Sequence, residues 1–375
     1  MSITQRIFLS LTALVLISAC NSSSTAETLP ILPRFTIEDL GALPPIAADT
    51  GLGINTSGQI SLWAHSGAVS VRAALWTGQR LEQLDPPPAG YLSSLARGLN
   101  DEGAWVGWAV TGGNLVDSLA TTRGFVRNGK KTRLVTTLGG RDSHAFAINS
   151  HGTIVGSADC ADGHCHAFQD DGKTMTDLGT LPGGGFSQAV AVNGSGVAVG
   201  VADENTSLQR QPRRHAVLWR GGHIQDLGIL PGGRASSALA VNEEGQAAGY
   251  SETLDGYHAA LWADGKIEDL GTLGNEPSIA RGLNDHGEVV GASYLEKRKR
   301  HAFYWQNGQM TDLNNLVPAR GWVLTQADAI NNRGQIACQG QYLSGPVHAL
   351  LLTPEVSSFA LRSQTSFRQA QTNSH

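Results

Sequence analysis

One short motif, Asn-x-x-Gly, recurs seven times along this chain and constrains its fold more than any other feature. The intervals between successive Asn residues are 45, 49, 44, 49, 42 and 47 positions. A period of this length indicates one array of repeated units rather than two or three independent domains. The seven copies are Asn55/Gly58, Asn100/Gly103, Asn149/Gly152, Asn193/Gly196, Asn242/Gly245, Asn284/Gly287 and Asn331/Gly334.

Each unit contains four short segments with the character of β-strands. The first ends at the Asn, and the residues four and two positions before the Asn are Ala or Gly in all seven units. The motif itself suits a tight turn into the second strand. The third strand carries His-Ala-x-x-Trp in its fullest form, as in His301 to Trp305, and the fourth ends in Asp-Leu, as in Asp312-Leu313. Four antiparallel strands in about 45 residues are the size of one propeller blade.

The sequence therefore predicts an all-β fold: a seven-bladed β-propeller of four-stranded antiparallel blades over residues 35–354. The composition agrees, because 46 Gly and only 16% charged residues favour tight turns over helical bundles. A β-solenoid is the second choice, although its coils usually repeat at shorter intervals. The last unit lacks a fourth strand, and an Asp39-Leu40 step precedes the first unit. We therefore expect residues 35–40 to complete the last blade, so that no sheet edge is left open.

Histidine and aspartate vary together between the units. In four units an Asp lies eleven positions after the third-strand His, and Asp39 would take that place beside His348 if the ring closes. Where Arg72 and Arg123 replace the His, the Asp is missing as well. Such groups are spread one per blade and cannot converge on one ion, so we interpret them as buried structural hydrogen-bonded pairs. The predicted pairs are His166/Asp177, His215/Asp226, His258/Asp269, His301/Asp312 and His348/Asp39.

A cysteine-rich hexapeptide, Cys160-Ala-Asp-Gly-His-Cys165, interrupts one unit between its second and third strands. In an exported protein this spacing favours a disulfide between Cys160 and Cys165. The alternative is metal binding through these two residues together with His164 and His166. We predict neither a metal ion nor a cofactor. Cys338 stands where five units have Gly, and we expect a buried free thiol there.

The N-terminus has the features of an export signal. Arg6 precedes an apolar stretch, residues 7–17, that is too short to span a membrane in the mature protein. The segment Ile17-Ser18-Ala19-Cys20 resembles a bacterial lipobox. That resemblance implies a signal peptide at residues 1–19, lipidation of Cys20 and a tether over residues 20–34. Asn21 after the cysteine implies the outer membrane by the sorting rule of enteric-type lipoproteins. The Ser-, Thr- and Gln-rich residues 355–375 are predicted to be a disordered tail.

The repeated unit also resembles the HAF repeat of extracellular bacterial proteins, over about residues 35–352. His301-Ala302-Phe303 and Asp177-Leu178-Gly179 carry this resemblance. It implies an extracellular repeat protein and does not specify a biochemical function.

Charge and motifs narrow the function further. A net charge of -5 argues against a globally basic nucleic-acid-binding protein. The sequence has no nucleophile elbow, phosphate loop or His-Glu-x-x-His motif. It predicts a monomeric binding or scaffold module at the cell envelope, attached to the membrane by its lipid. The alternative is a polysaccharide lyase or glycoside hydrolase of propeller fold, for which Arg97, Arg281 and Asp328 near the hub would form a polar site.

Two loops between second and third strands are strongly basic in this otherwise acidic chain. They belong to the units of Asn193 and Asn284, with one blade between them. We expect them to flank a surface for an anionic glycan, lipid headgroups or an acidic envelope protein. The residues of this predicted basic patch are Arg210, Arg213, Arg214, Lys297, Arg298, Lys299 and Arg300.

Overall fold

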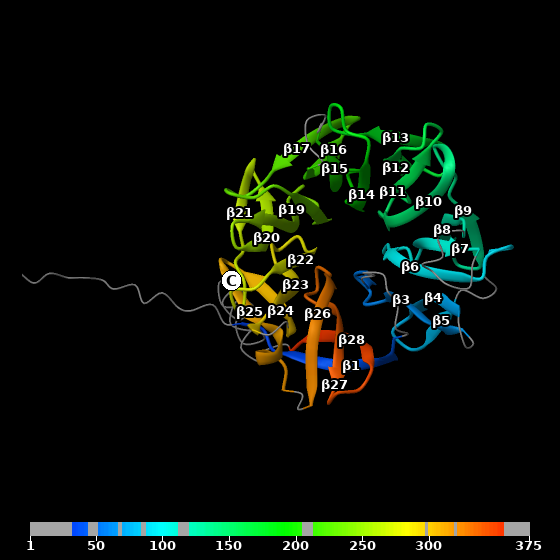
Figure 1. Ribbon diagram of the computed structural model, residues 1–375. Helices are drawn as coiled ribbons and strands as arrows, with labels where there is room; N and C mark the ends of the chain where they lie inside the picture. Colours follow the sequence, from blue (N-terminus) through cyan, green and yellow to red (C-terminus); the bar gives the residue numbers. More distant parts are fainter. Residues whose placement is uncertain are drawn as a thin grey trace, which may run out of the picture. The chain divides into compact units, whose positions relative to one another are not determined.

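A computed structural model describes residues 32–43, 52–66, 70–83, 88–111, 120–204, 213–296, 299–318 and 321–355. Over these residues the chain is a ring of seven four-stranded antiparallel sheets, so the predicted propeller is confirmed (Figure 1). The predicted signal peptide, Cys20, most of the tether and the C-terminal tail lie outside the described residues. No helix in the described part of the chain is long and apolar enough to cross a membrane.

Six blades each use four consecutive strands. The first three are β2–β5 (Gly53–Ile54, Ile60–Ser66, Ser70–Trp76, Leu81–Gln83), β6–β9 (Ser93–Leu99, Trp105–Val110, Thr122–Asn128, Lys131–Leu134) and β10–β13 (Gly139–Ile148, Ile154–Cys160, Cys165–Asp170, Met175–Gly179). The next three are β14–β17 (Ser187–Val192, Ala198–Asp203, Arg214–Arg220, His223–Gly228), β18–β21 (Ser236–Val241, Ala247–Thr253, Gly256–Ala263, Lys266–Asp269) and β22–β25 (Ser278–Leu283, Val289–Tyr294, Arg300–Gln306, Gln309–Asp312). A 3-10 turn, η2 (Leu313–Asn315), follows β25.

The seventh blade joins the two ends of the ring. It combines β26–β28 (Trp322–Ile330, Ile336–Tyr342, Val347–Pro354) with the N-terminal strand β1 (Phe35–Ala42). Strand β1 pairs antiparallel with β28, from Phe35 opposite Pro354 to Ala42 opposite His348. Figure 1 shows β1 alongside β28. The predicted closure by residues 35–40 is therefore confirmed, because β1 covers the edge of β28 that would otherwise be open.

The turns follow their sequence signatures. In every Asn-x-x-Gly turn the Gly N–H donates to the Asn carbonyl at 2.9–3.2 Å, and the Gly has a φ of 72–81°. A side chain would be strained in that left-handed conformation, which explains why Gly is used. Asp264-Gly265 and Asn307-Gly308 both have positive φ at each residue, as a two-residue type I′ hairpin requires.

The small residues before each Asn lie where neighbouring blades meet most closely. A Cβ added at Gly98 would lie 2.7 Å from the Phe146 carbonyl oxygen of the next blade, and one at Gly282 would lie 2.9 Å from the Ala329 Cα. Ala96, Ala145 and Ala189 are fully buried. Packing of one innermost strand against the next therefore requires the Ala and Gly pattern.

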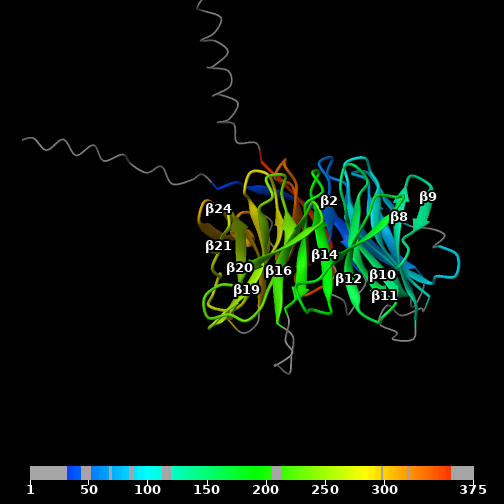
Figure 2. The ribbon, with the colours of Figure 1, turned by 90° about the horizontal axis from the view of Figure 1, so that it is seen from above.

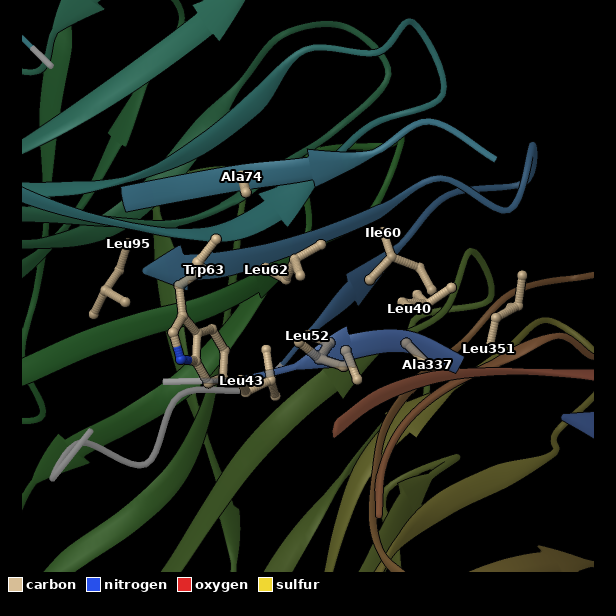
Figure 3. Packing of buried hydrophobic residues seen from close by; sticks show 12 residues of the cluster. Leu40, Leu43, Leu52, Ile60, Leu62, Trp63, Ala74, Leu95, Ala337 and Leu351 are labelled. Atoms are coloured by element: carbon tan, nitrogen blue, oxygen red, sulfur yellow. The ribbon is translucent and has the colours of Figure 1, made fainter. Parts of the chain in front are cut away.

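The seam of the ring is packed like its other interfaces. Leu40 and Leu351 of the closing blade belong to one buried cluster with Ile60, Leu62 and Trp63 of the first blade (Figure 3). Ile60 is fully buried and Trp63 is 3% exposed. Apolar burial of this kind stabilises by about 25 cal/mol per Å² removed from water, so the seam contributes to folding as well as to closure.

Candidate functional site: the two faces and the central channel

The strands run between two faces of the ring (Figure 2). We call the end that carries the Asn-x-x-Gly turns the turn face. The opposite end, with the second-to-third-strand loops and the linkers between blades, is the linker face. Phe35 pairs with Pro354, and the neighbouring Thr353 hydroxyl accepts a 3.4 Å hydrogen bond from Gln335, just after the Asn331 turn. The chain therefore enters the ring at the turn face.

Seven buried asparagines form a closed hydrogen-bonded ring around the channel. The side-chain Nδ2 of each Asn donates to the main-chain carbonyl of the Asn in the next blade, at 2.8–3.3 Å. The last bond, from Asn331 to Asn55, closes the circle at 2.8 Å. The Asn side-chain oxygens accept main-chain N–H groups of their own turns, as Asn149 does from His151 and Thr153. The sequence pattern indicates turns at these residues but not their contacts between blades.

The channel along the ring axis has two chambers. The inner chamber has a volume of about 250 Å³, and the chamber at the turn face about 220 Å³. An aliphatic residue stands directly before each Asn and lines both chambers. These seven residues are Ile54, Leu99, Ile148, Val192, Val241, Leu283 and Ile330.

The inner chamber brings together the three polar hub residues that the sequence singled out. Arg97, Arg281 and Asp328 all line it. The Arg97 guanidinium lies 5.8 Å from the centre of the Phe146 ring. Asp328 is 5% exposed and accepts hydrogen bonds from Gln326 at 2.5 Å and from Gln339 at 2.8 Å. Burial raises the pKa of the Asp328 carboxyl, and the charge of Arg281 opposes that shift. Among the described residues of this chamber, Asp328 is the only acid.

All five predicted His–Asp pairs are present. The His Nδ1 lies 2.7–3.0 Å from an Asp carboxylate oxygen in each, including His348 and Asp39 at 2.8 Å. Burial is lower than expected, because the histidine side chains are 11–21% exposed and the aspartates 17–44%. The pairs lie at the rim of the linker face, where solvent reaches the carboxylates, and not in the interior.

Each of these aspartates also holds the start of the following linker. A carboxylate oxygen accepts the main-chain N–H two residues later, as Asp177 does from Gly179 at 2.7 Å and Asp226 from Gly228 at 2.8 Å. Buried serines six positions before the Asn add a contact that was not predicted. Ser187 accepts from the Ala167 N–H and donates to the Gly179 carbonyl, which ties two blades together. The recurrence of Ser at that position was the available signal.

The two arginine substitutions have a structural explanation. Arg72 donates to the main-chain carbonyl of Leu92, and Arg123 donates to that of Arg141. Leu92 lies just before β6 and Arg141 lies in β10, and each of these strands is the first strand of the following blade. A long guanidinium therefore replaces the short imidazole and bonds to main chain, so no Asp is needed.

The electrostatics of one pair are well defined. The hydrogen bond that His215 donates to the Asp226 carboxylate raises the pKa of His215 above its ordinary value, and this effect exceeds the opposing effect of burial. Burial alone would raise the pKa of Asp226, but hydrogen bonds from His215 and the Gly228 N–H hold it below its ordinary value. The pair thus favours an imidazolium beside a carboxylate at mildly acidic pH.

The predicted disulfide is absent: Cys160 and Cys165 are both free thiols. Cys165 lies opposite Asp159 across strands β11 and β12, so these two side chains project to the same face of the hairpin. Cys160 is the residue after Asp159 and therefore projects to the other face. A short loop length favoured a bridge, but strand pairing separates the two sulfurs. Burial raises the pKa of Cys165 to about 11. Cys338 is fully buried and free, as predicted.

The predicted basic patch is only partly described. Arg210, Lys297 and Arg298 lie outside the described residues. Lys299 is exposed and Arg213 and Arg300 are half-buried at the linker face. Arg214 is exposed, and its guanidinium lies 3.2 Å from Asp203 Oδ1 and 4.2 Å from the centre of the Phe186 ring. Lys299 borders a hollow of about 480 Å³ that a linker and a loop form together.

No family model and no curated protein matches this chain. Among solved structures, the β-propeller domain of the Trilobed protease from Pyrococcus furiosus has a TM-score of 0.54 at 7% identity, over 85% of this chain and 95% of that one. YCF48 bound to D1 peptide has a TM-score of 0.49 at 14% identity, over 88% and 97% of the two chains. TolB from Acinetobacter baumannii has a TM-score of 0.44 at 12% identity, over 80% and 64%. The first similarity supports the propeller fold and the fold alone.

Proposed function

We propose that this protein is an exported HAF-repeat lipoprotein, anchored in the outer membrane through Cys20, whose propeller binds an anionic component of the cell envelope at its linker face. The lipobox-like segment ending at Cys20 and the repeat pattern of residues 35–352 support the first part of this proposal. The proposed binding mode follows from the arrangement of the two faces.

The observation that carries the proposal is the separation of the chain's entry point from the basic loops. The segment that follows Cys20 joins the ring at Phe35, on the turn face. Arg213 and Lys299 belong to loops on the opposite, linker face. A tether attached on one side leaves the other side accessible to a partner, and 15 residues can span roughly 50 Å when extended.

The charged residues at the turn-face mouth of the channel also differ in sign from those of the two basic loops. Asp101, Glu243 and Asp285 line the chamber at the turn face. The linker face carries the two basic loops, so an anionic partner is favoured there and disfavoured at the opposite mouth. Each surface lysine or arginine contributes modestly, about 1 kcal/mol near an anionic surface, and binding should be weakened by salt.

The described residues of the inner chamber do not provide the carboxylate pair of a typical glycoside hydrolase. Most glycoside hydrolases flank the scissile bond with two carboxylates. Asp328 is the only carboxylate among the described residues of that chamber, and Gln326 and Gln339 already bond to it.

A binding screen tests this proposal. Soluble protein that begins at Asn21 would be passed over an immobilised sulfated glycan, an immobilised uronic-acid polymer and detergent-solubilised envelope proteins, each at low and at high salt. We expect saturable binding to at least one anionic target and weaker binding as salt rises. Binding to none of them at low salt, or binding that salt does not change, would overturn the proposal.

A further inference from the structure

Three metal-ligating side chains converge in the blade β10–β13 at the linker face. One ligand atom from each of Cys160, His166 and Asp177 lies within 4.8 Å of the other two. His166 Nδ1 is 2.8 Å from Asp177 Oδ2. Cys160 and His166 are half-buried and Asp177 is exposed, so an ion can reach the group from solvent.

Strand pairing produces this grouping. His166 lies opposite Ala158 across strands β11 and β12, and Cys160 lies two residues beyond Ala158 on the same face of the sheet. The next strand, β13, supplies Asp177. Cys165 projects from the other face, so the structure does not support the four-residue set of Cys160, His164, Cys165 and His166 that the sequence left as an alternative.

The other blades show what the cysteine adds. Four other blades form the same His–Asp pair without a thiol, so Cys160 is not needed for that pair. The position of Cys160, two residues beyond the residue opposite the His, is occupied in the other four His-containing blades by Glu204, Thr253, Leu295 and Tyr342.

We propose that Cys160, His166 and Asp177 bind a zinc ion. Zinc accepts thiolate, imidazole and carboxylate together, whereas calcium and magnesium require oxygen ligands. Ligand atoms of a tetrahedral zinc ion lie roughly 3.3–3.8 Å apart, so small side-chain rotations bring the three atoms to bonding positions. Three protein ligands leave the fourth position for water. This proposal departs from the sequence-based prediction that the chain binds no metal.

The experiment uses the full chain, reduced and freed of metal with a chelator. Zinc would be titrated in competition with a chromogenic chelator, and cobalt(II) would be added separately as a spectroscopic probe. We expect one zinc per chain and a near-ultraviolet thiolate-to-cobalt charge-transfer band. Cys160→Ala should abolish that band and lower the zinc affinity by at least roughly 10-fold. The cobalt spectrum of the wild-type protein tests the site even if a variant folds poorly.

Two matched variants serve as controls. Cys165→Ala removes the other thiol of the same hairpin, and His258→Ala breaks a His–Asp pair whose blade has Thr253 in place of the cysteine. Both should bind zinc as the wild type does. The proposal would be overturned by a cobalt spectrum without a thiolate band, by unchanged zinc affinity in Cys160→Ala, or by an equal loss of affinity in His258→Ala. A Cys160–Cys165 disulfide in the untreated protein, detected as a mass lower by two hydrogens, would also overturn it.

Discussion

Asp39 and His348 are 309 positions apart in the chain, yet Asp39 Oδ1 lies 2.8 Å from His348 Nδ1. Four other blades form the same pair within one hairpin, and here it joins the two ends of the ring. It places the first strand in register with the last, and the same carboxylate accepts the Gly41 N–H at 2.9 Å. The closing blade is therefore built by the same rules as its neighbours, although its strands come from opposite ends of the sequence.

Deleting residues 35–41 should destabilise the whole ring. It removes β1, exposes the edge of β28 and uncovers Leu351 at the seam, so we expect loss of cooperative unfolding or aggregation. Asp39→Ala should cost about 0.5–1.5 kcal/mol, because the pair is partly exposed. Urea denaturation measures both effects, with Glu38→Ala on the same strand as the control. A deletion variant as stable as the full chain would contradict the closure.

The asparagine ring should be sensitive at every position. Asn193→Ala removes the donor to the Asn242 carbonyl and the acceptor of the Val197 N–H, which leaves buried main-chain groups without partners. We expect a loss of about 1–3 kcal/mol in the free energy of unfolding. Asn128→Ala, at an exposed hairpin end, should change stability little. Equal effects of the two substitutions would show that the ring bonds do not stabilise the fold.

The His215–Asp226 pair should make stability depend on pH. The pKa of His215 is raised in the folded protein, so its contribution is complete below the ordinary value of 6.5 and declines as pH rises through the folded value. The pKa of Asp226 is lowered, so its contribution is present above the ordinary 3.8 and declines as pH falls through the folded value. Asp226→Asn should therefore destabilise most between about pH 4 and 6.5. Denaturation at pH 5 and pH 9 checks this, with Glu268→Gln as the control; a larger effect at pH 9 would be inconsistent with it.

Lipidation makes a prediction about localisation. Cys20→Ala should abolish incorporation of labelled fatty acid and move the protein from the membrane fraction to the soluble fraction, because several acyl chains are needed for durable anchoring. Cys338→Ala, at the buried thiol, should leave labelling unchanged and serves as the control. Labelling that persists in Cys20→Ala would rule out this anchor.

Much of the fold could be predicted from the sequence because the repeats make each inference testable seven times. The Asn-x-x-Gly period determined the number of blades, and the orphan Asp39-Leu40 step indicated which strand closes the ring. The His–Asp pairs could be recognised because both residues vary together between units. Repetition thus supplied the information that a single blade would not contain.

Other features depend on geometry that spacing does not convey. The asparagine ring joins the Asn55 carbonyl to the Asn331 side chain, and no local pattern indicates a contact between blades. The disulfide prediction failed because loop length ignores the alternation of strand faces, which places Cys165 away from Cys160. The same alternation brings Cys160 beside His166, a relationship that appears only once the strand register is known.

The central claim is that the linker face binds the anionic partner, and a comparison of two charge-matched variants tests it most directly. One variant carries Arg210→Gln, Arg213→Gln, Lys297→Gln and Lys299→Gln in the two basic loops. The other carries Lys130→Gln, Lys131→Gln, Lys173→Gln and Lys266→Gln in exposed hairpins of the turn face. Both lose the same net charge, so any difference reports the face and not the overall field.

The measurement is the dissociation constant of each variant for the anionic target at low salt. We predict that the variant in the basic loops, the linker-face variant, binds at least roughly 10-fold more weakly than the wild type. It loses four basic side chains, each of which contributes modestly to binding an anionic surface. The turn-face variant should bind nearly as the wild type does. Equal affinities of the two variants would contradict the account.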